Sequence, residues 1–379
     1  MDSIASQISK RRALDYHKPR AHHKNATGGV NDEQETNKPP AHLPSETRDK
    51  TTSQQAESQA AFTHRGQTLD LKIEPAEPEL RRDYLFHDYV LIAPKRFNRP
   101  FDSRAHSGQL FETASSPRLD IQEEVFSLKD DHGGWYTKVV NNKFPSLTLD
   151  NPKAYGKQEI VIDTPLANVQ LGELDEKQLV NVLMTYQERI RDLSKIDNIQ
   201  YVLVFKNEGH HAGASLAHAH TQIFALPMVP QRFIAQANLI EQYYDQTKVD
   251  PFDSIIKFEK SDGKRIINET ENLLTFCPYA PLWPLETWIL PKSAVRSFDQ
   301  LTSQQLFELA GSLRQVTAKL TGSLVNYNFF IENGVSEHHR LTIKIRGRDV
   351  VSPWGGFEVA TGMAINTIPP EAAAAWYKS

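Results

Sequence analysis

The sequence predicts an α+β protein built from two tandem copies of one unit, each an antiparallel sheet with flanking helices. Three observations indicate this. Short strand-like runs alternate with turn residues, one long segment in each half has helical spacing, and the second half repeats the order of the first. The chain has 379 residues, which is long enough for a large core and about two domains.

Order begins near Leu80, and the first half carries five strand-like runs and one helix-like run. The segment 174–193 is predicted to be a helix, because its apolar residues recur at three- and four-residue spacing. The strand-like runs are rich in β-branched and aromatic residues. They span 89–93, 135–140, 158–163, 200–206 and 218–225. Together these runs predict a mixed α+β unit.

The second half repeats this order at a constant offset. Glu159-Ile-Val-Ile matches Glu286-Thr-Trp-Ile, and 286 − 159 = 127. Leu174-Asp-Glu-Lys-Gln-Leu matches Leu301-Thr-Ser-Gln-Gln-Leu, and 301 − 174 = 127. A shared offset across two elements indicates an internal duplication.

A polar segment precedes the repeats. Residues 1–72 are poor in aliphatic side chains and rich in His, Gln, Ser, Thr, Asn, Lys and Pro. Such a segment buries too little apolar surface to offset its ordering entropy, so we interpret it as a disordered tail. The remainder divides into an N-terminal domain, 73–229, and a C-terminal domain, 230–379.

Composition excludes several classes of protein. The 43 basic and 47 acidic residues leave a formal charge of −4, which argues against a nucleic-acid-binding surface. The sequence has no apolar run of the roughly eighteen residues that a membrane span needs, and its N-terminus lacks the apolar core of a secretory signal. Cys277 is the only cysteine, which excludes an intramolecular disulfide and a cysteine-rich zinc site and favours a cytoplasmic location.

The segment His218-Ala-His220-Thr-Gln222 places three polar side chains at alternate positions in an apolar setting. If the segment is a strand, a period of two puts His218, His220 and Gln222 on one face. The residues before it are small or polar and would let a diphosphate approach the backbone. These residues are Asn207, Gly209, Gly213 and Ser215.

Two imidazoles and an amide side by side suit attack on a phosphate. Imidazole is a nucleophile near neutral pH, because much of it is unprotonated there. Attack by His220 on an α-phosphorus would form a phosphoramidate and divide one nucleotidyl transfer into two steps. The other ring nitrogen must then be held as a donor, most simply by a nearby backbone carbonyl. Gln222 would donate its amide to a non-bridging phosphate oxygen as charge develops.

Spacing alone leaves three interpretations of this segment open. The histidines could be catalytic, they could bind a metal, or they could be structural residues with satisfied hydrogen bonds. In the second repeat, His338 and His339 are adjacent and would face opposite ways on a strand. The nucleophile candidate therefore lies in the first repeat.

A series of motifs resembles the galactose-1-phosphate uridylyltransferase branch of the histidine triad superfamily, from about residue 81 to the C-terminus. The resemblance implies two histidine-triad-like repeats with an active site at their junction, and nucleotidyl transfer through a histidine intermediate. The motifs follow the family's order. They are the opening strand and arginine-rich turn at 81–100, the asparagine-bearing strand end at 141–145, the active-site strand pair at 205–222, the start of the second repeat at 283–292, and the closing segment at 356–366.

Carried over position by position, the resemblance implies that His220 is the nucleophile, that Gln222 supports the transferred phosphoryl group, and that His218 positions its neighbour. The other implied residues contact the substrate. Arg96 and Arg99 would face the phosphates or the nucleotide, Asn142 the ribose or base, Asn207, Gly213 and Ser215 the phosphates, and Glu358 the sugar.

The chain departs from the family at both metal sites. Many members bind zinc through a Cys-x-x-Cys pair, a later histidine and the first histidine of the active-site motif. Here 101–110 has no cysteine, Ala167 stands at the later histidine, and only His218 remains, so we predict no zinc and no other cofactor. The iron-site histidines of some members fall on Thr342 and Lys344, which leaves His338 alone. Lys344 would touch a phosphate or point outward.

The sequence therefore predicts a ping-pong nucleotidyltransferase. A nucleoside monophosphate would move from a nucleotide sugar to a hexose-1-phosphate, and hexose-1-phosphate uridylyltransferase is the favoured label. The alternative is phosphorolysis of ADP-glucose or a dinucleoside polyphosphate with phosphate as acceptor, because 213–222 resembles that branch at least as well. An alternative of another class is a non-catalytic nucleotide-binding protein. The resemblance is compatible with a homodimer, and no nucleic acid or membrane is expected as a partner.

Overall fold

The structure is a computed structural model. It describes residues 62–64, 67–69, 71, 73, 77–84, 88–94, 123–167, 169–214, 216, 218–348 and 355–379. Most of the predicted tail lies outside these residues. Inside the predicted tail, β1 (Phe62–His64) and β2 (Gln67–Leu69) form an antiparallel pair, and Leu71 belongs to the main core. Regular structure thus starts before the predicted boundary at residue 72, and Ser58–Ser379 form one compact unit.

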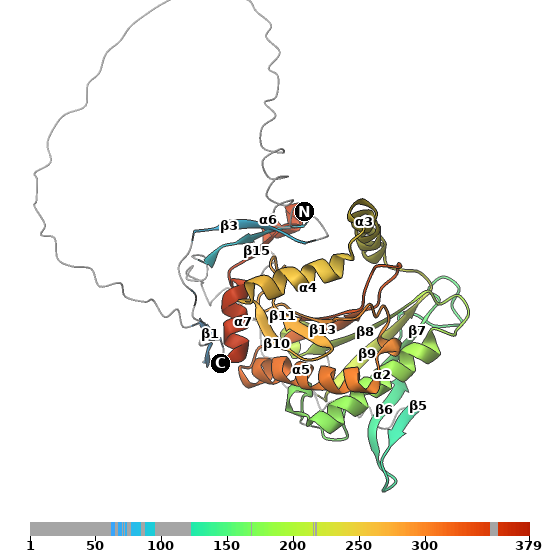
Figure 1. Cartoon of the computed structure of the whole chain (residues 1–379). Helices are drawn as coiled ribbons and strands as arrows, with labels where there is room; N and C mark the ends of the chain where they lie inside the picture. Colours follow the sequence, from blue (N-terminus) through green and yellow to red (C-terminus); the bar gives the residue numbers. More distant parts are fainter. Residues whose placement is uncertain are drawn as a thin grey trace, which may run out of the picture. The chain divides into compact units, whose positions relative to one another are not determined.

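Among the described residues, ten strands form one antiparallel sheet, to which each repeat contributes five (Figure 1). Their spatial order is β10-β11-β12-β14-β13-β8-β9-β7-β6-β5. The first repeat supplies β5 (Glu124–Lys129), β6 (Trp135–Asn141), β7 (Lys157–Ile162), β8 (Tyr201–Glu208) and β9 (His220–Leu226). The second supplies β10 (Ile266–Glu269), β11 (Leu273–Phe276), β12 (Thr287–Pro291), β13 (Tyr327–Glu332) and β14 (Thr342–Gly347).

The strand order is the same when counted inward from either edge, and this symmetry confirms the duplication. From the β5 edge, the first repeat runs first, second, third, fifth and fourth strand, and from the β10 edge the second repeat does the same. The two fourth strands, β8 and β13, meet in the middle, where Asn207 lies opposite Asn328. The predicted halves are therefore joined through main-chain hydrogen bonds into one sheet.

One face of the sheet is covered by the long helix of each repeat, α2 (Glu176–Leu193) and α5 (Ser303–Gly322), which lie side by side (Figure 1). Asp175 and Thr302 cap these helices by accepting hydrogen bonds from backbone N–H groups three residues on. The caps are related by 302 − 175 = 127. The 3₁₀ turns before them, η4 (Leu171–Glu173) and η6 (Phe298–Gln300), keep the same offset, since 298 − 171 = 127.

The main core lies between these helices and the sheet. Apolar side chains at helical spacing on both helices pack against alternate residues of the strands, because a strand presents every second side chain to one face. The last helix of the chain, α7 (Pro370–Lys378), adds Trp376 and Tyr377 to this core.

The opposite face is covered mainly over the second repeat. There α3 (Gln231–Thr247) and α4 (Pro251–Asp262) place Ile240, Phe252 and Ile255 against β11 and β12. A smaller sheet has the order β15-β4-β3. It consists of β15 (Ala364–Asn366), β4 (Tyr89–Ile92) and β3 (Glu79–Arg82), and α6 (Gly356–Thr361) precedes β15.

The repeat offset changes by one residue between the helices and the third strands. Glu159 faces the helix layer, where Arg189 of α2 binds it, whereas Glu286 binds Trp288 on the opposite face. The sequence match of Glu159 with Glu286 is thus not a structural equivalence. Val161 and Ile289, which both pack in the helix-covered core, are the true counterparts, and 289 − 161 = 128.

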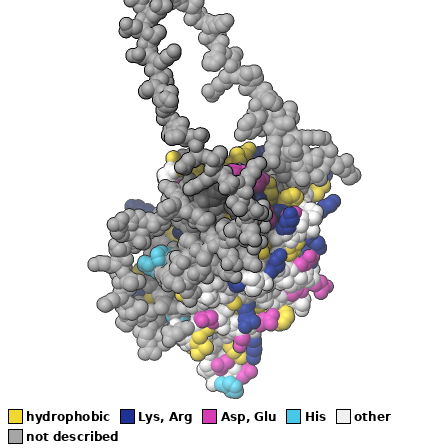
Figure 2. Space-filling model, turned by 90° about the vertical axis from the view of Figure 1, so that its left-hand side faces the viewer, with side chains coloured by type: hydrophobic (Ala, Val, Ile, Leu, Met, Phe, Trp, Pro, Cys, Tyr) yellow, Lys and Arg dark blue, Asp and Glu magenta, His cyan; other side chains and the backbone are white. Residues whose placement is uncertain are grey.

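The helices that the structure describes include none long and apolar enough to cross a membrane. On the face shown in Figure 2, basic and acidic side chains are interspersed over the described surface. This mixture matches the formal charge of −4.

A buried ion pair that anchors α2 to β7 yields a stability prediction. The guanidinium of Arg189 binds both carboxylate oxygens of Glu159 at 2.8 and 3.1 Å, and the Glu159 side chain is fully buried. Arg189→Met should destabilise the protein by about 3 kcal/mol in urea unfolding, because it leaves a buried carboxylate with only Lys157 as partner. Arg191→Met, which removes an exposed pair of the same helix, should cost about 0–1 kcal/mol. Equal effects of the two substitutions would contradict this account.

Candidate active site

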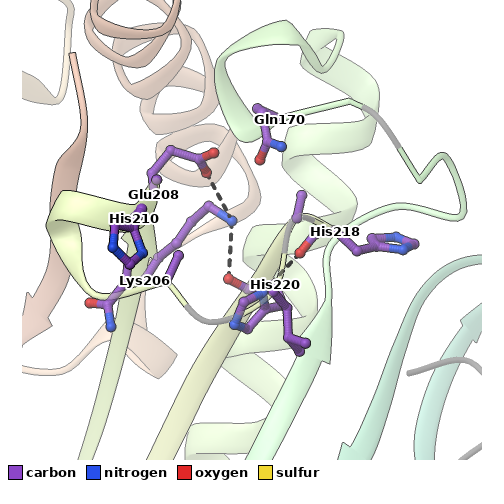
Figure 3. Close-up of a pocket in the computed structure, with 11 residues that line it drawn as sticks. Gln170, Lys206, Glu208, His210, His218 and His220 are labelled. Atoms are coloured by element: carbon purple, nitrogen blue, oxygen red, sulfur yellow. Dashed lines mark hydrogen bonds and ion pairs between the residues drawn. The ribbon is translucent and has the colours of Figure 1, made fainter. Parts of the chain in front are cut away.

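A cavity of about 300 Å³ opens where β8 ends and β9 begins (Figure 3). The loop between these strands, including the 3₁₀ turn η5 (His210–Ala212), forms one wall, and the segment before η4 forms another. The residues that line the cavity are Gln170, Lys206, Asn207, Glu208, Gly209, His210, Ala214, Leu216, His218, Ala219 and His220. The cavity therefore contains both histidines of the predicted motif.

The His220 imidazole is held in one tautomer. Its Nδ1 lies 2.8 Å from the backbone oxygen of His218. A carbonyl can only accept, so Nδ1 carries the proton and Nε2 keeps its lone pair. This is the arrangement that the sequence analysis required of a nucleophile, with the carbonyl two residues away on the same segment.

Burial and charge keep this imidazole neutral. His220 is 5 % exposed. Burial lowers the pKa of His220 below its ordinary value of 6.5, and the nearby ammonium of Lys206 lowers the pKa further. A neutral ring at pH 7 is the reactive form, because protonation would occupy the Nε2 lone pair.

Gln222 lies on the same face of β9 as His220. The residues between and beyond them, Thr221 and Ile223, point to the helix-covered side, where Ile223 joins the main core. The predicted alternation is therefore confirmed for these two side chains. Gln222 is half-buried and lies opposite Phe205 of β8.

His218 departs from the predicted strand. β9 begins at His220, so His218 belongs to the preceding loop and the period of two does not extend to it. Its Nε2 donates to the backbone oxygen of Thr164 at 2.7 Å, and its ring points away from the Lys206 ammonium (Figure 3). His218 contacts its neighbour through its backbone carbonyl rather than through its imidazole.

A cluster of buried charges lies beneath His220. The ammonium of Lys206, which is 1 % exposed, lies 3.0 Å from Asp163 and 3.2 Å from Glu208. The same ammonium donates to the backbone oxygen of His220 at 3.0 Å. Burial lowers the pKa of Lys206, but the charges of Asp163 and Glu208 outweigh it and the net pKa is raised, so the side chain stays cationic. Burial raises the pKa of Glu208.

The loop before β9 has a backbone that only glycine readily adopts. Gly209 has φ of 84°, and a Cβ there would overlap the Asn326 side chain. Gly213 has φ of 92° and its carbonyl accepts from Asn207 at 3.4 Å. Asn328 of the second repeat donates to the Asn207 side chain at 2.8 Å, which ties this loop to the junction of the repeats.

Two predicted substrate contacts lie outside this cavity. Asn142 follows β6, which lies two strands away from β9 in the sheet. It is level with Phe224 of β9, which is about 13 Å along that strand from His220. Its side chain accepts from the Phe144 N–H. Glu358 is buried, and its carboxylate accepts from the Gly355 N–H at the start of α6. The remaining predicted contacts, Arg96, Arg99 and Ser215, lie outside the described residues.

The former metal positions carry other interactions. Lys344 is buried, forms an ion pair with Glu332 at 2.5 Å and lies over the Trp288 ring, so it does not point outward, and a phosphate contact stays a prediction. His338 bonds to Glu241 at 2.6 Å. Within the described ranges, no group of three or more His, Cys, Asp or Glu side chains is placed to hold a metal ion. The absence of zinc stays a prediction.

Known proteins share both the sequence pattern and the fold. Residues 126–230 match the family model for the N-terminal domain of galactose-1-phosphate uridyl transferase. An ADP-glucose phosphorylase from Arabidopsis thaliana is 29 % identical over 331 residues, which are 79 % of this chain and 92 % of that protein. A galactose-1-phosphate uridylyltransferase from Thermotoga maritima is 29 % identical over 263 residues, or 62 % of this chain and 82 % of that protein.

A solved structure agrees with these matches. The crystal structure of an ADP-glucose phosphorylase from Arabidopsis thaliana with bound ADP-glucose superposes with a TM-score of 0.69 at 27 % identity. The superposition covers 80 % of this chain and 99 % of that chain. In sequence and in fold, the chain is similar to galactose-1-phosphate uridylyltransferases and to ADP-glucose phosphorylases.

Sequence reasoning missed the charges beneath His220 in this uridylyltransferase-like protein. Lys206 and Asp163 each adjoin an apolar strand, Tyr201-Val-Leu-Val-Phe and Glu159-Ile-Val-Ile. A charge beside such a run is buried only when it is paired, so two opposite charges at the ends of two apolar strands are a usable signal. Thr164 acts through its carbonyl, for which the sequence holds no signal.

The lowered pKa of His220 yields a pH prediction. In the folded protein, the ring should titrate below 6.5, and in urea it should return to about 6.5. As pH falls through 6.5, the unfolded chain therefore takes up the proton first, and the stability that His220 contributes above this pH is lost. Titration of the ring by NMR, with His220→Asn to assign the signal, measures both values. A folded-state pKa at or above 6.5 would contradict the account.

Proposed function

We propose that this protein transfers a nucleoside monophosphate from a nucleotide sugar through a covalent bond to Nε2 of His220. One observation carries the proposal. The buried imidazole is neutral, and the His218 carbonyl holds its Nδ1 as a donor, so that only Nε2 can attack. The solved relative with bound ADP-glucose supports a nucleotide sugar as the donor.

The reaction would have two balanced steps. In the first, the Nε2 lone pair forms a bond to the α-phosphorus, and the bond from that phosphorus to the bridging oxygen breaks, which releases the sugar 1-phosphate. In the second, an oxygen of the acceptor attacks the same phosphorus, and the P–N bond breaks. The leaving group is a phosphate monoester and a weak base, so the first step requires no strong general acid.

Gln222 and a second cavity suit the phosphate oxygens and the sugar or base of the donor. Gln222 projects from the same face as His220 and can donate to a non-bridging oxygen as charge develops. A second cavity of about 300 Å³ adjoins the first along β8 and β13. Aromatic rings, two arginines and two asparagines surround it, and this mixture suits a sugar or base linked to a phosphate. Its polar and aromatic lining consists of Phe205, Lys206, Asn207, Arg232, Phe233, Trp283, Asn328, Phe329, Phe330, Glu332 and Arg346.

ADP-glucose with inorganic phosphate is the donor and acceptor pair that we propose first. The similarity to an ADP-glucose phosphorylase over 92 % of that protein favours it. A hexose-1-phosphate uridylyltransferase, which the sequence analysis favoured, is the second candidate, because the Thermotoga maritima enzyme is equally identical over a shorter stretch. The two differ in the base of the donor and in the acceptor. The predicted cytoplasmic location and homodimer stay predictions.

Intact mass spectrometry tests the covalent step. After incubation with ADP-glucose alone, the protein should gain the mass of an adenylyl group, and UDP-glucose or UDP-galactose should give a uridylyl group if the second candidate is correct. His220→Asn should lower the rate of adduct formation at least roughly 10³-fold, because the nucleophile is lost. Phosphate or a hexose-1-phosphate, added afterwards, should remove the adduct and identify the acceptor.

The control for this experiment is His132→Asn, an exposed histidine in the turn between β5 and β6. This variant should form the adduct at the wild-type rate. No adduct with any of the three donors would favour a non-catalytic nucleotide-binding protein. An adduct that persists in His220→Asn would assign the nucleophile to another residue.

Removal of the Gln222 amide tests its role separately. Gln222→Met keeps the size of the side chain but cannot donate, so the single-turnover rate should fall roughly 10²–10³-fold. The donor Kd should change little, because the amide is expected to act mainly on charge that develops in the transition state. A lower affinity with an unchanged rate would make Gln222 a ground-state binding residue instead.

A further inference from the structure

Lys206 is joined to the nucleophile through the protein backbone. Its ammonium donates to the carbonyl of His220 at 3.0 Å and lies 3.0 Å from the Asp163 carboxylate. Thr221 and Tyr186 also donate to this carboxylate, each at 3.1 Å. Lys206 is thus fixed on the helix-covered side of β9, while the His220 imidazole projects from the other side.

The second repeat offers an internal comparison for this cluster. Thr221 lies opposite Val161, and Ile343 lies opposite Ile289. Because Val161 and Ile289 are counterparts in the helix-covered core, Thr221 and Ile343 are counterparts too.

The same reasoning identifies the counterpart of Lys206. Gln222, which follows Thr221, pairs with Phe205, and Lys344, which follows Ile343, pairs with Phe330. The next residues along these strands are Lys206 and Ile331, which therefore occupy equivalent places. At the offset of the third strands, Asp163 corresponds to Pro291, since 291 − 163 = 128.

The repeat that lacks the nucleophile therefore has an apolar residue at each of these three places. Ile331 and Ile343 are fully buried in the main core. The fold thus forms here without charges, and burial of an ion pair is often no more stabilising than apolar packing of similar volume. The charged cluster occurs in the repeat that carries His220, which points to a role at the site rather than in the fold.

We propose that Lys206 is a positioning residue for the nucleophile. Its ammonium, oriented by Asp163, holds the His220 carbonyl and so fixes the first residue of β9, from which the imidazole projects toward the cavity. This role rests on the proposed function of His220. Lys206 also lines the cavity, but the role proposed for it rests on the hydrogen bond from its ammonium to the His220 carbonyl.

Single-turnover kinetics test the proposal. Lys206→Met should slow formation of the nucleotidyl-histidine roughly 10²-fold, because a nucleophile displaced by about 1 Å attacks that much more slowly. The Kd of ADP-glucose should stay at the wild-type value. A wild-type rate in the folded Lys206→Met variant would overturn the proposal.

A double variant separates positioning from stability. Lys206→Met leaves the Asp163 carboxylate buried without its cation and should lower Tm. Lys206→Met with Asp163→Asn removes that charge and should recover part of the Tm, while adduct formation stays slow because no donor reaches the His220 carbonyl. Recovery of the rate together with Tm would overturn the proposal.

Arg189→Met is the matched control. Arg189 is also a buried cation, it is paired with Glu159 of β7, and neither residue lines either cavity. This variant should lose stability, because Glu159 loses its main partner, but should form the adduct at the wild-type rate. An equal loss of rate in Arg189→Met would show that any destabilised sheet slows the reaction, and would also overturn the proposal.

An NMR measurement keeps this test independent of the transfer reaction. The Nδ1–H signal of His220 should exchange slowly in the wild type and in Arg189→Met, since the His218 carbonyl holds it. In Lys206→Met, the signal should exchange rapidly and broaden. If the wild type forms no adduct, the proposed function fails while this signal still decides the positioning role. An unchanged signal in Lys206→Met would overturn that role alone.

Discussion

The hydrogen bond from His220 Nδ1 to the His218 carbonyl is the interaction on which the proposed chemistry depends. It is made within one short segment, but it requires that segment to be fixed at both ends. β7 fixes it on one side, where Ile162 pairs with His220, and the Lys206 ammonium fixes it on the other. The extended sheet therefore acts as a rigid support for one side chain.

Duplication explains how such a support arises and why only one half uses it. Each repeat supplies the same five strands and capped helix, so both could hold a side chain at the first position of the fifth strand. In the second repeat that position is Thr342, and apolar residues fill the space beneath it. The first repeat has the buried charges and the glycine-bearing loop that opens a cavity. The common fold was thus kept while the local chemistry diverged.

The sequence predicted the fold well where periodicity was long or repeated. The helix at 174–193 and the strands before it agree with α2, β4, β6 and β7 within a few residues, because burial of one face imposes the period. The offset of 127 holds for the caps and turns but not for the third strands. The sequence alignment of Glu159 with Glu286 is displaced by one residue from the structural equivalence, and on a strand such a displacement places the side chain on the opposite face.

The predicted common face holds for His220 and Gln222, since alternation along one strand decides it. The predicted strand fails to include His218, because a strand boundary depends on hydrogen bonds between segments distant in the sequence. Lys206 and Asp163 meet only because β8, β9 and β7 are neighbours. Asn142 and Glu358 were carried over from a resemblance, and local hydrogen bonds to Phe144 and Gly355 hold them here.

The central claim is that Nε2 of His220 alone is free to attack, because the His218 carbonyl holds Nδ1. Phosphorus NMR of the isolated nucleotidyl-enzyme, prepared with ¹⁵N-labelled histidine, tests this claim most directly. The account predicts one phosphoramidate signal with one-bond coupling to Nε2, which is absent from His220→Asn. Coupling to Nδ1, or a phosphorus without coupling to any histidine nitrogen, would contradict it.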